Sequence, residues 1–200
     1  MVAKKRSTFD EILLQGIRKG QVPARSKKAR EWFRRKAKQF KVSGEDLLKE
    51  DKSRQRAKTK IQVGRMFMYV YDPKHKKTLP YYDKFPLIFP IAFRKKGFLG
   101  INLHYLPPVL RAQLMEALYS LINNKKFDET TKLKISYKIL KRASKFKAFK
   151  PCIKEYLYSH VKSRLIEVYS SEWDIGLFLP TADWAKASQQ KVWRDSRKMI

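Results

Sequence analysis

The sequence is poor in cysteine, in acidic residues and in long apolar runs, and each shortage excludes a class of protein. Cys152 is its single cysteine, which excludes an intramolecular disulfide and a zinc site built from several cysteines. We therefore expect a free, buried thiol, with a reducing interior or an assembled particle as its setting. No run approaches the roughly 18–20 apolar residues that span a bilayer, so we expect no membrane partner. The patterns GxxxxGKS/T and GxGxxG are missing too, and we expect no cofactor.

The scarcity of acidic residues leaves a large positive charge. Of 200 residues, 47 are Lys or Arg and only 18 are Asp or Glu, which gives a formal net charge of +29. Such an excess opposes compactness by self-repulsion unless a polyanion provides counter-charge. Apolar residues still make up 43% of the chain, which is enough for a buried core in part of it. DNA, RNA or an acidic protein surface could provide this counter-charge, and nucleic acid is the leading candidate partner.

The amino-terminal third is the most basic part by density and has the least material for a core. We interpret residues 1–63 as a basic helical arm. Ser7 or Thr8 is suited to cap a short first helix. A second helical window covers residues 24–41 with a thin apolar stripe, and residues 45–60 form a last charged helix or an irregular arm.

Residues 64–200 have the pattern of an α+β core domain. Runs of aromatic and β-branched residues predict strands at 66–71, 87–93, 98–105 and 164–169. Pro90 lies inside the second run and predicts an edge strand or a bulge, because proline cannot donate to a ladder. Helical spacing predicts helices at 107–122, 131–144 and 151–159, and a last helix within 183–200. The expected fold class is α+β, with a basic helical amino-terminal arm, a small antiparallel sheet or partly open barrel, and carboxy-terminal helices.

Few side chains are spaced for catalysis. The histidines, at positions 75, 104 and 160, occur in no catalytic or metal-binding spacing and are interpreted as surface or packing residues. A metal-dependent nuclease needs converging carboxylates, for which the candidates are Asp72, Asp83, Glu172 and Asp174. Asp72 also suits a turn, and Glu172 suits a helix start. We therefore expect a protein that is not an enzyme, with a nuclease as the less favoured alternative.

A proline-rich loop after the first strand places aromatic beside basic side chains. Tyr81 and Tyr82 could stack on exposed bases or terminal base pairs while neighbouring lysines contact phosphates. Those lysines are Lys74, Lys76, Lys77 and Lys84. The alternative is that Tyr81, Tyr82 and Phe85 only close the open end of the sheet.

The second helical window provides the other candidate phosphate contacts. They are Lys27, Lys28, Arg30, Arg34, Arg35, Lys36 and Lys38. No base-reading motif accompanies them, so the charge predicts DNA binding without sequence preference.

Several strings resemble a family of small basic proteins encoded by large contractile-tailed bacteriophages. The strings are MFMYVYDPKHKKTLPYYDKFPLIFPI, GFLGINLHYLPP, KISYKILK and EWDIGLFLPT, and they lie within residues 64–182. The resemblance implies a setting in a phage virion or in the host cytoplasm during infection. Among phage proteins of this size and charge, it points to the proteins that protect DNA ends from host exonuclease. No motif transfers functional residues to this chain, and the first 63 residues lie outside the resemblance.

Three hypotheses follow from these observations. In the first, the protein binds phage DNA without sequence preference, at genome ends or during packaging, by neutralising phosphates. In the second, it is a structural component of the virion neck or baseplate, and its basic arm contacts other virion proteins. The third is the nuclease, which would require a divalent metal.

Overall fold

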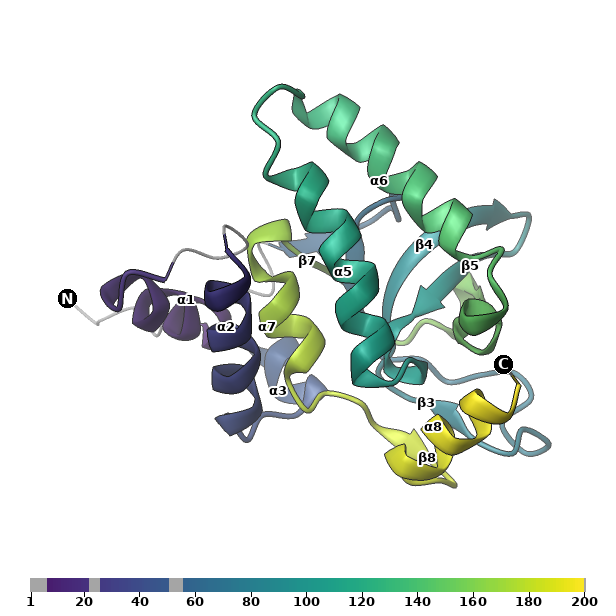
Figure 1. The fold of residues 1–200 in the computed structure, drawn as a ribbon. Helices are drawn as coiled ribbons and strands as arrows, with labels where there is room; N and C mark the ends of the chain where they lie inside the picture. Colours follow the sequence, from purple (N-terminus) through teal and green to yellow (C-terminus); the bar gives the residue numbers. More distant parts are fainter. Residues whose placement is uncertain (1–6, 22–25, 51–55, 200) are drawn as a thin grey trace.

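The computed structural model describes residues 7–21, 26–50 and 56–199, and shows an antiparallel sheet with helices packed on one face (Figure 1). The six strands of the sheet run in the order β1-β7-β2-β4-β5-β6, and the sheet does not close. They are β1 (Ala57–Lys58), β2 (Met66–Met68), β4 (Leu87–Arg94), β5 (Gly97–Asn102), β6 (Ile153–Leu157) and β7 (Leu165–Val168). A small second sheet pairs β3 (Tyr82–Asp83) with β8 (Trp184–Ala185). The predicted α+β class with a small open antiparallel sheet is confirmed.

The helices lie in front of the sheet and beside it. Helices α5 (Pro108–Ile122) and α6 (Glu129–Ala143) cross the sheet, and α7 (Trp173–Phe178) lies between α5 and α2 (Figure 1). Helices α1 (Thr8–Arg18), α2 (Lys27–Gln39) and α3 (Gly44–Lys49) form the amino-terminal side, and α8 (Gln189–Lys198) ends the chain. In the described residues, no helix has the length and apolar content to cross a membrane.

Alternation along the strands divides the buried side chains between two faces of the sheet. In β2, Met66 and Met68 lie in the larger core beneath the helices. Phe67, between them, and Tyr69 lie in a second cluster with Phe98 and other aromatic side chains. Because successive side chains of a strand point to opposite faces, one short strand contributes to both clusters.

The amino-terminal helices pack into the same core as the sheet. Ser26 caps α2 by accepting from the Ala29 nitrogen at 3.1 Å, and Ala29, Phe33 and Ala37 follow on one buried face. Phe33 is 1% exposed and belongs to the larger core, as does Phe9 of α1. The expectation that this segment carries charge with little core material is therefore wrong for these side chains, because their narrow stripe packs against α7. The boundary between residues 63 and 64 stays a prediction.

The strand predictions are confirmed for the central hairpin. Arg94 pairs with Gly97, so a tight turn of Lys95 and Lys96 joins β4 to β5. Pro90 lies next to an irregularity of the register between Pro90 and Ala92, as a bulge requires, although β4 is an inner strand. The predicted strand at residues 164–169 returns to the sheet as β7, between β1 and β2.

Other predicted elements are wrong. The middle of the helix predicted over residues 151–159 is a strand, β6, because Ile153–Leu157 pairs with the free edge of β5. Short 3-10 helices, Lys147–Cys152 and Tyr158–His160, flank this strand. Gly97 allows this pairing, since a Cβ there would lie 2.0 Å from the Tyr156 carbonyl oxygen. Likewise, part of the segment 45–60 forms β1, which pairs with β7 instead of continuing a helix. The segment 183–200 begins with β8 before its predicted helix, α8.

Candidate nucleic-acid interface

The basic residues predicted on α2 divide into an exposed set and a paired set. The exposed side chains are those of Lys27, Lys28, Arg35 and Lys38, while Lys36 is half-buried. The apolar stripe of α2 fixes this division, because it turns the opposite face of the helix to solvent. These cations are in position to contact a polyanion.

Arg30 and Arg34 point inward instead and bind carboxylates of other helices. Arg30 donates from Nε to Glu116 Oε1 at 3.3 Å and makes a second, closer bond to the same carboxylate. Arg34 donates from Nε to Asp174 Oδ1 at 2.8 Å and from Nη2 to Glu116 Oε1 at 3.3 Å. Burial opposes the charge of Arg34, but the two carboxylates outweigh it and raise the pKa of the guanidinium. Both arginines thus join α2 to α5 and α7 and have little charge left for DNA.

The proline-rich loop is held in a fixed path. Tyr71 donates its backbone nitrogen to Lys84 O at 2.9 Å, and β3 pairs with β8. Lys186, in a left-handed conformation with φ 66°, donates from Nζ to the carbonyl oxygens of Lys76, Lys77 and Leu79 at 2.6, 2.9 and 3.1 Å. Sequence reasoning missed Lys186, because its acceptors lie more than 100 residues away in the chain.

The predicted lysines of the loop are all exposed, but they differ in their partners. Lys76 is paired with Asp72 at 2.9 Å and Lys84 with Asp183 at 3.1 Å. Lys74 and Lys77 form no ion pair within the described ranges, so their charge is available to a ligand. Exposed pairs are weak, and a phosphate could replace the carboxylates of the other two.

The predicted aromatic side chains have different environments. Phe85 is 3% exposed and lies in the core, as expected for a side chain that closes the open end of the sheet. Tyr81 is half-buried, with its ring 6.1 Å from Trp184 and 6.2 Å from Tyr105. Tyr82 is half-buried in β3. The structure therefore brings the two tyrosines to the surface of the core rather than into it.

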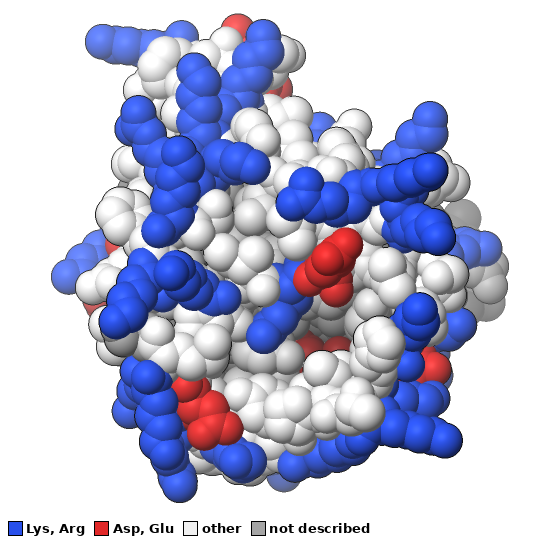
Figure 2. Space-filling model, turned by 90° about the vertical axis from the view of Figure 1, so that its right-hand side faces the viewer, with Lys and Arg blue, Asp and Glu red and all other residues white. Residues whose placement is uncertain are grey.

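A cavity of about 610 Å³ lies between this loop and strand β6. Its aromatic lining is Tyr71, Tyr81, Tyr82, Tyr105 and Tyr156, and Lys74 and Lys154 also line it. Figure 2 shows a hollow on the corresponding side of the molecule, with Lys and Arg side chains around it and a few acidic side chains near it. The volume falls within the range of about 300–1,000 Å³ that ligand sites occupy.

Lys154 is a second residue that sequence reasoning missed. The segment around it was assigned to a helix, whereas in β6 it alternates with neighbours and shares a face with Tyr156. The sequence offers little signal for this strand, because Ile153–Leu157 does not alternate apolar and polar residues.

The four carboxylates considered for a nuclease lie apart, each with its own partner. Asp72 pairs with Lys76, Asp83 with His104, Glu172 with Arg56 and Asp174 with Arg34. Asp83 Oδ2 lies 2.7 Å from His104 Nδ1, and both are buried. Across residues 7–21, 26–50 and 56–199, no group of three or more His, Cys, Asp or Glu side chains is placed to hold a metal ion.

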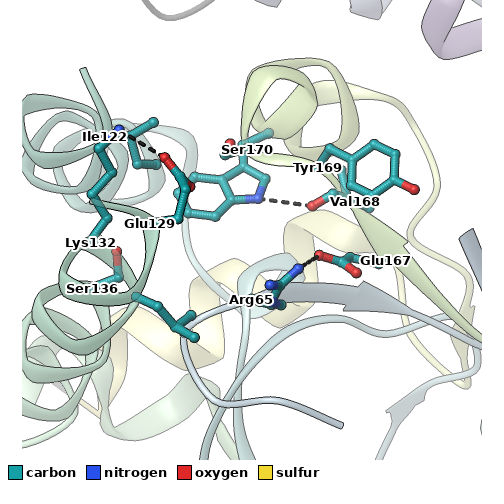
Figure 3. Close-up of a pocket in the computed structure, with 12 residues that line it drawn as sticks. Arg65, Ile122, Glu129, Lys132, Ser136, Glu167, Val168, Tyr169 and Ser170 are labelled. Atoms are coloured by element: carbon teal, nitrogen blue, oxygen red, sulfur yellow. Dashed lines mark hydrogen bonds and ion pairs between the residues drawn. The ribbon is translucent and has the colours of Figure 1, made fainter. Parts of the chain in front are cut away.

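A smaller cavity, of about 170 Å³, lies between α6 and the end of β7 (Figure 3). Arg65 donates to Glu167 at 2.5 Å there, and Lys132 donates to Glu129 at 2.9 Å. Trp173 donates from Nε1 to the carbonyl oxygen of Val168 at 3.0 Å. The larger cavity is the better candidate for a nucleotide, because its volume of about 610 Å³ falls within the range of ligand sites and 170 Å³ does not.

Comparison with known proteins adds one finding. A family model described as phage T4 terminal DNA protecting protein matches residues 6–196 of the chain, which includes the basic α2 and the proline-rich loop. No curated protein and no solved structure matches it.

Proposed function

The chain belongs to the family of phage T4 terminal DNA protecting proteins, and on this basis we propose that it binds the ends of a phage's double-stranded DNA by neutralising phosphates, without reading sequence. The family gives the setting, which is infection with the phage genome. The mechanism rests on charge, and the observation that carries it is the set of exposed cations on α2 and the loop that form no ion pair within the described residues.

These cations come from two elements that are far apart in the sequence. Lys27, Lys28, Arg35 and Lys38 stand on α2, and Lys74 and Lys77 stand on the loop. The net charge is +29, so the cations of the protein repel one another. DNA phosphates that replace small counterions reduce this repulsion and stabilise the complex. Contacts of this kind position a protein on the duplex but carry no sequence information.

The test is a titration of the full chain with a fluorescent duplex at several salt concentrations. Each neutralised phosphate adds about 0.9 to the slope of log affinity against log salt, so six contacts would weaken binding by about a thousandfold between 50 and 200 mM salt. Unrelated duplex sequences should bind equally well. An affinity that does not change with salt, or that varies strongly with sequence, would overturn this mechanism.

A charge variant and a matched control make the test specific. Replacing Lys27, Lys28, Arg35 and Lys38 by Gln should reduce both the affinity and the salt slope, because these side chains are exposed and support no fold contact of the kind that Arg34 makes. Glu31→Gln, an exposed change on the same helix, should leave DNA binding equal or slightly tighter. Association with other virion proteins stays a prediction, tested by whether the protein remains on particles emptied of DNA.

A further inference from the structure

We propose that the cavity between the proline-rich loop and β6 binds the phosphate-bearing terminal nucleotide of a DNA strand, with Lys154 contacting the phosphate. This inference rests on the proposed function and adds the group that would be recognised at a DNA end. It follows from the shape of the cavity, from its tyrosines and from a lysine without a carboxylate partner.

Lys154 differs from Arg111, which is buried and donates to two backbone carbonyl oxygens, and from Arg34 and Arg56. Arg34 and Arg56 each bind a buried carboxylate. The ammonium group of Lys154 lies 4.2 Å from the centre of the Tyr105 ring and, among described residues, makes no ion pair. Burial lowers its pKa, and the ring provides only part of the missing solvation. A partly desolvated cation beside a cavity favours an anion that enters it.

The other walls of the cavity suit a nucleoside. Tyr81 and Tyr82 come from the loop, and Tyr71 and Tyr156 come from the side of the sheet. Aromatic faces bind any base by stacking, which needs no sequence preference. The Lys186 contacts and the pairing of β3 with β8 hold the loop in place, so the cavity exists before a ligand binds.

Two acidic residues line the cavity, but they do not prevent a phosphate from binding there. Asp83 is buried and its oxygens are engaged: Oδ1 accepts from the Phe85 nitrogen at 3.0 Å, and Oδ2 accepts from Asn102 Nδ2 at 2.9 Å and contacts His104. Glu155 is exposed and also lines the cavity. The Glu155 carboxylate repels an incoming phosphate. Neutralising it by Glu155→Gln should therefore strengthen phosphate binding, whereas removing the charge of Lys154 should weaken it.

A terminal nucleotide fits this cavity better than an internal one. An internal nucleotide would have to unpair and rotate out of the duplex, with the strand continuing on both sides, and this costs free energy before any contact forms. At a duplex end the last pair frays, and the strand continues on one side only. The cavity therefore favours DNA ends over the interior of a duplex, because only a terminal nucleotide can enter it easily. The charge of Lys154 in turn favours an end that carries a phosphate over an end with a hydroxyl.

The experiment measures the affinity of the full chain for hairpin duplexes that each have one end. Three versions carry a 5′-phosphate, a 3′-phosphate or hydroxyls only, and a closed circular duplex provides an end-free reference. We expect the duplex with one of the two phosphorylated ends to bind about tenfold more tightly than the duplex with hydroxyls only. Whether this is the 5′-phosphate or the 3′-phosphate identifies the recognised terminus. Lys154→Met should remove this preference and leave the affinity for circles within about twofold, whereas Glu155→Gln should increase the preference.

The outcomes separate this proposal from the proposed function. Equal affinity for phosphate and hydroxyl ends, with circles still bound, overturns the cavity assignment alone. Loss of binding to every duplex at physiological salt overturns the proposed function as well. Thermal melting confirms that Lys154→Met is folded; if it is not, the comparison of ends with the unmodified protein and with Glu155→Gln still decides.

Discussion

Arg34 of α2 donates from its Nε to Oδ1 of Asp174 in α7 at 2.8 Å, and Asp174 is 4% exposed. Burial raises the pKa of Asp174, although the neighbouring guanidinium favours its charged form. One residue further along α2, Arg35 is exposed. Two adjacent arginines of one basic helix thus have different tasks, one in the fold and one at the surface.

Removing Arg34 should therefore destabilise the protein. We expect Arg34→Met to lower the free energy of unfolding by about 3 kcal/mol, because Asp174 stays buried without its counter-charge. Urea unfolding followed by tryptophan fluorescence measures this. Arg35→Met is the matched control and should change stability by less than about 0.5 kcal/mol while weakening DNA binding. Equal unfolding midpoints for the two variants would contradict the structural role of Arg34.

The contact of Glu116 with Arg30 and Arg34 predicts a pH dependence. Burial alone would raise the pKa of Glu116, but the hydrogen bonds and charges of the two arginines outweigh it and lower the pKa. A carboxylate with a lowered pKa in the folded state contributes stability above its unfolded pKa, and this contribution is lost as pH falls through the folded value.

The corresponding variant is Glu116→Gln. At pH 7 it should be less stable than the unmodified protein by about 1 kcal/mol, since the carboxylate is partly exposed. The difference should shrink as pH falls through the folded pKa of Glu116, because the carboxyl group then becomes protonated in both states. Asp174 is present in both proteins, so its own titration cancels. A stability difference that stays constant or grows in acid would contradict this account.

The packing of Phe33 predicts that α2 unfolds together with the sheet. Phe33→Ala should cost about 3–5 kcal/mol, because it leaves a cavity at a side chain that is 1% exposed. Far-ultraviolet circular dichroism and tryptophan fluorescence should show one coincident transition at a lower midpoint. Glu31→Ala, exposed on the same helix, is the control. A separate early transition would instead favour an independent arm ending near residue 63.

The sequence predicted what local patterns determine. The hairpin of β4 and β5 follows from two apolar runs and a short basic turn, and the helix at Pro108 follows from its spacing. It did not separate Arg34 from Arg35, because the deciding partner of Arg34 lies 140 residues away. Lys154 was missed for a related reason: the free edge of β5 makes its segment a strand, and only the fold brings it near Tyr105. The structure places the two loop tyrosines at a cavity, and the predicted stacking of Tyr81 and Tyr82 on bases remains a prediction.

Cys152 gives a last prediction, which concerns reactivity. Its side chain is fully buried and its Sγ lies 2.9 Å from the carbonyl oxygen of Phe149, to which it donates. Burial raises the pKa of the thiol to about 12. At pH 8 only about one thiol in ten thousand is then ionised, and the thiolate is the form that reacts.

Ellman's reagent should therefore leave the native protein unlabelled over hours and label one thiol per chain at once in guanidinium chloride, with Cys152→Ala as the blank. Rapid labelling under native conditions would show that the segment before β6 opens readily, and would contradict the close packing of Cys152 in the core.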